Sequence, residues 1–72
     1  MQRYEYRELV TDMQGWTRVR YVDGHEQPDW QTGPRMVDYL NQLGAEGWDL
    51  VSVCAHGGPW NARLYTLRRP LA

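Results

Sequence analysis

The feature that most constrains the fold is a single helix-forming segment placed between segments of strand periodicity. Residues 34–46 repeat apolar side chains at helical spacing. The stripe consists of Met36, Val37, Leu40 and Leu43. Alternation typical of strands covers residues 3–10, 16–22, 48–54 and 62–69. The chain therefore predicts an α+β domain: a small, mostly antiparallel sheet of three to four strands with one helix on one face, in the order β-β-α-β-β.

Local signals bound the predicted helix. Thr32 or Gly33 is expected to cap it, with Pro34 at the first helical position. Gly47 is expected to take the left-handed conformation that ends a helix. Residues 23–33 are polar and contain two glycines and a proline, so a loop is predicted there.

The shortness of the chain limits its core. With 72 residues, the sequence predicts one domain over residues 1–72, and folding hides only about 60% of the surface of an unfolded chain of this size. A lone monomer would be marginally stable, and disulfides, a metal or oligomerisation are the usual remedies. Cys54 is the single cysteine, so no intrachain disulfide can form, and no Cys/His set has zinc spacing. Oligomerisation is the remedy that we expect.

The predicted sheet carries apolar side chains on both faces. Alternation places Trp48 and Leu50 on one face and Val51 and Val53 on the other. Because one helix covers one face, we expect a homo-oligomer through the sheet face opposite the helix.

The charge balance excludes several partners. The chain has eight basic residues, all of them arginine, and nine acidic residues, which give a net charge of -1. There is no overall field to attract nucleic acid or an anionic membrane. No apolar run approaches the length of a membrane span, and the first residues lack the apolar region of a signal peptide. We therefore expect a cytoplasmic protein that does not associate with a membrane.

Three motifs resemble those of a known family. They are Y-E-Y at residues 4–6, L-N-Q-L-G-A-E-G-W-D-L-V-S-V at residues 40–53, and R-R-P-L at residues 68–71. In these places the chain resembles the small bacterial domain-of-unknown-function (DUF) family 4177, over about half its length. Residues 11–33 look longer than the family's usual connection. The resemblance implies a β-α-β-β frame and supplies no catalytic residue.

Catalytic and metal-binding patterns are weak. His25, with Glu26 and Asp29 nearby, has no diagnostic ligand spacing. Cys54 precedes His56 by two residues, which is too close along a strand edge to indicate a dyad. Cys54 is expected to be a small buried core residue. We therefore predict no catalytic residues, no metal and no cofactor, and do not expect an enzyme.

Aromatic and guanidinium groups are the most suggestive content. Four tryptophans and five tyrosines accompany the eight arginines. These side chains are typical both of subunit interfaces and of sites where a ligand stacks on an aromatic ring. The first hypothesis is a non-enzymatic, oligomeric interaction module of unknown partner. The second is a small-ligand or nucleotide-binding protein with a site between subunits, formed by His25, Trp30, Arg35 and Trp60.

Overall fold

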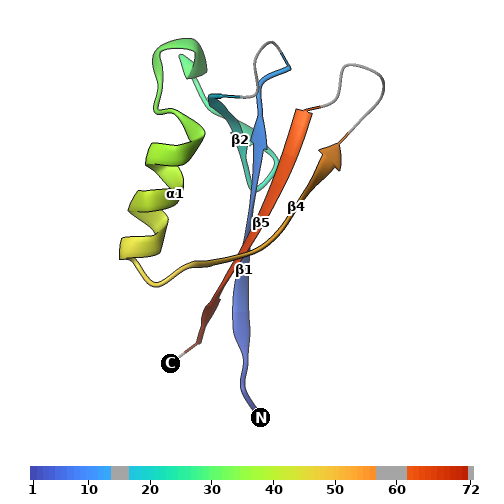
Figure 1. Cartoon of the computed structure of the whole chain (residues 1–72), viewed down its shortest axis with the longest axis vertical. Coiled ribbons are helices and arrows are strands. Elements are labelled where there is room, and N and C mark those ends of the chain that lie inside the picture. Colours follow the sequence, from blue (N-terminus) through green and yellow to red (C-terminus); the bar gives the residue numbers. More distant parts are fainter. Residues whose placement is uncertain (14–16, 57–61, 72) are drawn as a thin grey trace.

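The fold is α+β, with one helix and a five-stranded antiparallel sheet (Figure 1). The computed structural model describes residues 1–13, 17–56 and 62–71. Its elements are β1 (Tyr4–Thr11), β2 (Val19–Val22), β3 (His25–Glu26), a 3-10 turn η1 (Trp30–Thr32), α1 (Met36–Ala45), β4 (Asp49–His56) and β5 (Ala62–Pro70). The α+β class is confirmed. The fifth strand is β3, which lies inside the predicted loop and is only two residues long.

The strand order is β3-β2-β1-β5-β4, so the two ends of the chain form the centre of the sheet. β1 pairs with β5 along its length, from Tyr4 opposite Pro70 to Val10 opposite Leu64. β2 pairs with the second half of β1 in an antiparallel hairpin. This arrangement leaves the short β3 at one edge and the eight-residue β4 at the other.

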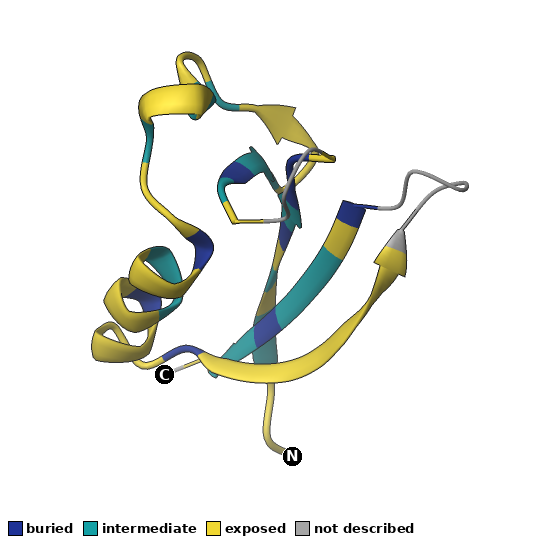
Figure 2. Cartoon of the chain, turned by 45° about the horizontal axis from the view of Figure 1, so that its top comes forward, coloured by how far each residue is buried: buried dark blue, intermediate teal, exposed yellow. Residues whose placement is uncertain are grey.

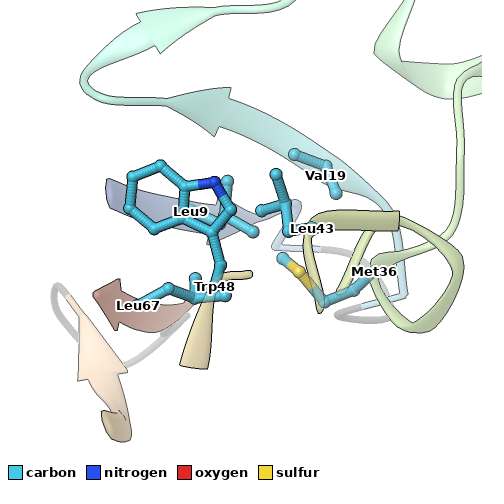
Figure 3. Close-up of a cluster of buried hydrophobic side chains, with 6 residues drawn as sticks. All are labelled: Leu9, Val19, Met36, Leu43, Trp48 and Leu67. Carbon is cyan, nitrogen blue, oxygen red and sulfur yellow. The ribbon is translucent and has the colours of Figure 1, made fainter. Parts of the chain in front are cut away.

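The core lies between α1 and the middle of the sheet (Figure 3). Its six buried apolar residues are Leu9, Val19, Met36, Leu43, Trp48 and Leu67. The helix contributes Met36 and Leu43, while Leu40 is half-buried. Val37, which the helical stripe also predicted to be in the core, is 55% exposed. The helix contacts the sheet with a narrower face than the sequence pattern predicted.

The start of α1 differs from the prediction. Arg35, not Thr32 or Gly33, is the N-cap, and Pro34 precedes the helix. The cause is a short β-bridge between Arg18 and Arg35, which holds this segment extended. The Met36 N–H then donates to the Thr17 carbonyl at 2.6 Å. Tertiary pairing therefore replaces the side-chain cap.

The end of α1 matches the prediction. Gly47 has φ of +94°, in the left-handed region. The Gly47 N–H donates to Gly44 O at 3.0 Å and the Trp48 N–H to Leu43 O at 3.1 Å. This pair of bonds is a Schellman motif, which satisfies the last carbonyls of the helix. It also turns the chain so that Trp48 enters the core.

A β-bulge changes the predicted faces of β4. Leu50 pairs with Leu67 and Val53 with Tyr65, with an irregularity between Leu50 and Ser52. Leu67 and Tyr65 share one face, because strand residues alternate. Leu50 and Val53 therefore both lie on the helix side, whereas simple alternation placed them on opposite faces.

Cys54 is exposed, contrary to the prediction of a buried core residue. The reason is that β4 is an outer strand and that Cys54, opposite Leu64, lies on the sheet face away from α1. All described side chains of β4, residues 49–55, are exposed (Figure 2).

The three motifs at residues 4–6, 40–53 and 68–71 meet around Trp48. The Arg69 guanidinium lies 4.4 Å from the centroid of the Trp48 ring. It also donates to Glu5 Oε1 at 3.0 Å and to the Glu46 carbonyl at 3.2 Å. Arg7 approaches the same ring at 4.9 Å. These contacts join β1, the helix end and β5, so the motifs carry a structural role in this chain.

The molecule is elongated for its size. Its radius of gyration is 12.5 Å, against about 11 Å for a compact chain of this length. It exposes 5118 Å² of surface, against roughly 4,700 Å² expected for a monomer of this mass. One short helix covers only part of the sheet (Figure 1).

Candidate functional site

The sheet face opposite the helix is the largest candidate surface. Because Leu9 and Leu67 point to the helix, the register assigns their neighbours to the other face. This open face carries Tyr4, Tyr6, Glu8, Val10, Tyr21, Asp49, Ser52, Cys54, Leu64, Thr66 and Arg68. Tyr6 is 60% exposed, and Arg68 lies 4.3 Å from the centroid of the Tyr4 ring. The surface is aromatic and apolar at its centre, with few charges.

A hollow of about 410 Å³ adjoins the open face where β1, β2 and β5 meet. It is lined by Val10, Thr11, Met13, Arg20, Tyr21, Gly24 and Ala62. Most of this lining is apolar, with one guanidinium at the wall. A hollow of this kind suits a small, flat group that carries a negative charge.

Arg20 is held beside the hollow by three groups. Its guanidinium lies 4.8 Å from the centroid of the Trp30 ring and 5.5 Å from that of Tyr21. Its Nε donates to Glu26 Oε2 at 2.8 Å. The hydrogen bond to Glu26 raises the pKa of Arg20 above its ordinary value. Arg20 therefore stays charged in a fixed orientation.

Of the four residues of the predicted site, the structure describes three, and these come from different elements. Trp30 is half-buried beneath Arg20, while His25 lies exposed on β3. Arg35 instead lines a second hollow, of about 310 Å³, on the helix side. Trp60 lies outside the described residues.

Arg20 is the residue that sequence reasoning missed. The alternating pattern of residues 16–22 marks it only as one polar position in a strand. Its role depends on Glu26 and Trp30, which follow in the segment predicted to be a loop. No local signal shows that this segment folds back over β2.

Within residues 1–13, 17–56 and 62–71, no group of three or more His, Cys, Asp or Glu residues could hold a metal ion. The described part of the chain has no helix long and apolar enough to cross a membrane.

Comparison with protein-family models, curated proteins and solved structures finds no match to this chain.

Proposed function

We propose that this protein is a small, non-enzymatic interaction module that self-associates through the open face of its sheet. The observation that carries the proposal is the uncovered aromatic and apolar surface on that face, where Tyr6 is 60% exposed and Tyr4, Val10, Tyr21 and Leu64 are half-buried. Tyrosine and arginine are the residue types enriched at protein interfaces, and this face places Tyr4, Tyr6 and Arg68 together. A second copy would bury a surface that one helix leaves open.

The cellular setting belongs to the same proposal. A single exposed thiol at Cys54 suits the reducing cytoplasm, where disulfides are rare. Membership of the bacterial family 4177 is likewise proposed, on the strength of the three motifs alone.

The open-face interface is tested with Tyr6→Glu. Tyr6 lies opposite Arg68, so the folded monomer can tolerate a carboxylate at position 6. In a dimer the same carboxylate would be desolvated. Sedimentation velocity is expected to show at least a roughly tenfold weaker association than for the wild type.

Val37→Glu is the matched control. Val37 is similarly exposed and apolar, but it lies on α1, away from the open face. This variant is expected to associate like the wild type. A wild type that remains monomeric at high micromolar concentration, or equal weakening by both variants, would contradict the proposal.

A second candidate function is the binding of a small aromatic anion, such as a nucleotide. The observation that favours it is the position of Arg20, stacked on Trp30 and lining the hollow. Since the hollow adjoins the open face, a ligand bound there would lie between two associated copies.

A further inference from the structure

The two edges of the sheet are protected to different degrees. β3 has two residues, one of them the charged Glu26, and its neighbour Arg20 adds a second charge. Short, charged edges resist pairing with another strand. β4 is eight residues long, and its outer row of backbone N–H and C=O groups faces no other strand of the described sheet.

The side chains of β4 are those of a strand that pairs rather than one that is protected. Its central segment, residues 50–55, contains no charge and no proline. Leu50, Val51 and Val53 are 47%, 44% and 45% exposed. An exposed, long, apolar edge is the usual template for strand addition.

A second copy of β4 fits this edge by symmetry. In a two-fold antiparallel pair, each residue must face one from the same side of the sheet. Val53 can oppose Val53 of the second copy, and Ser52 can oppose Cys54, because both point to the open face. Since the bulge takes up one residue, Leu50 then faces Ala55, and the strands overlap over their whole length.

The excess exposed surface of the chain is about half of what a stable interface takes from one partner. A stable interface takes about 800 Å² from each partner. The chain exposes about 400 Å² more than a compact monomer of its mass. Pairing of β4 would remove part of this excess and satisfy the outward backbone groups.

We propose that β4 pairs with β4 of a second copy, antiparallel and centred on Val53, to join two five-stranded sheets into one. This contact is separate from the open-face interface, because it uses the edge of the sheet and its backbone. Either contact can form without the other.

Cysteine cross-linking tests the register. In a Cys54→Ser background, Val53→Cys places two thiols opposite each other across the two-fold axis. Directly opposed Cβ atoms lie about 4.5–5.5 Å apart, within a small shift of disulfide geometry. Under mild oxidation at micromolar concentration, disulfide-linked dimers are expected to form at least about tenfold faster than in the control.

The control is Asn41→Cys in the same background, since Asn41 is exposed on α1. Equal cross-linking rates for the two cysteine variants would overturn the proposal. As a second variant, Val53→Lys places an edge-protecting charge at an exposed position that the folded monomer tolerates. It is expected to reduce the associated mass, and an unchanged mass would also overturn the β4 pairing.

Tyr6→Glu separates this inference from the proposed function. Added to the Val53→Cys variant, it is expected to leave the cross-linking rate unchanged. Rapid cross-linking with no effect of Tyr6→Glu on association supports β4 pairing and contradicts the open-face interface. Association that Tyr6→Glu weakens, without rapid cross-linking of the Val53→Cys variant, supports the open-face interface and contradicts β4 pairing. If β4 bound unrelated extended peptides in preference to a second copy, the proposal that a second copy is its partner would be overturned.

Discussion

At the scale of single residues, arginines organise the structure by stacking on aromatic rings. Arg69 and Arg7 approach the Trp48 ring and help hold the helix end to the sheet. Arg20 stacks on Trp30 in the same manner, but beside an open hollow. A guanidinium offers planar hydrogen-bond donors as well as a stacking face. At Trp48 the guanidinium groups hold the core together, whereas Arg20 lines a hollow that a ligand can enter. Arg20 is the one placed to contact a small molecule.

Ligand binding at Arg20 is tested by tryptophan fluorescence. Adenosine monophosphate is the probe, because it combines a flat ring with a phosphate. If the hollow binds it, fluorescence is quenched and saturates, and Arg20→Met is expected to weaken binding about tenfold or more through loss of the charged donor. Arg3→Met, at an exposed position, should bind like the wild type. Absence of quenching across a panel of nucleotides would remove this second function.

At the scale of the element, the helix end decides how the chain enters the sheet. The Schellman motif at Gly47 requires a left-handed residue, and the next residue, Trp48, is 5% exposed in the core. A built Cβ at Gly47 would also stand 3.5 Å from Arg69 Cδ, an ordinary contact. The strain of a substitution there comes from the backbone and not from crowding.

Gly47→Val is expected to lower the free energy of unfolding by about 1–3 kcal/mol, because a β-branched residue is forced to positive φ. Gly44→Ala is the matched control within the same helix. No atom lies within 4 Å of a Cβ built at Gly44, so alanine there should raise stability by about 0.5–1 kcal/mol. Chemical denaturation measures both. An unchanged midpoint for Gly47→Val would contradict the role of the motif.

At the scale of the whole molecule, the sheet is wider than the helix that packs against it. One ten-residue helix packs against the centre of a five-stranded sheet and leaves the outer strand β4 exposed (Figure 2). No helix of the described residues covers the open face. The core is correspondingly thin, with six residues in its main cluster. A fold of this kind gains more from association than a compact domain does.

Thermal stability should therefore depend on protein concentration. Association of folded chains raises the melting temperature by mass action, and a hundredfold increase in concentration is expected to raise it by about 5 °C or more. Scanning calorimetry or circular dichroism from low to high micromolar concentration measures the shift. The double variant Tyr6→Glu/Val53→Lys should melt at a temperature independent of concentration. A wild-type melting temperature that does not change would contradict self-association.

Much of the fold follows from local sequence signals. The helix, its end at Gly47, the β1–β2 hairpin and the burial of Trp48 depend on periodicity and on one backbone conformation. These properties act over a few residues, so they are readable along the chain.

The tertiary structure decided the rest, because the remaining features depend on residues far apart in sequence. The bulge in β4 put Leu50 and Val53 on one face, and the edge position of β4 exposed Cys54. The β-bridge between Arg18 and Arg35 moved the start of the helix. By itself, the sequence determined one helix against a largely antiparallel sheet. The strand order and the length of the helix decide which surfaces stay exposed. Both the neighbours of each strand and the part of the sheet beneath the helix are fixed only when the chain has folded.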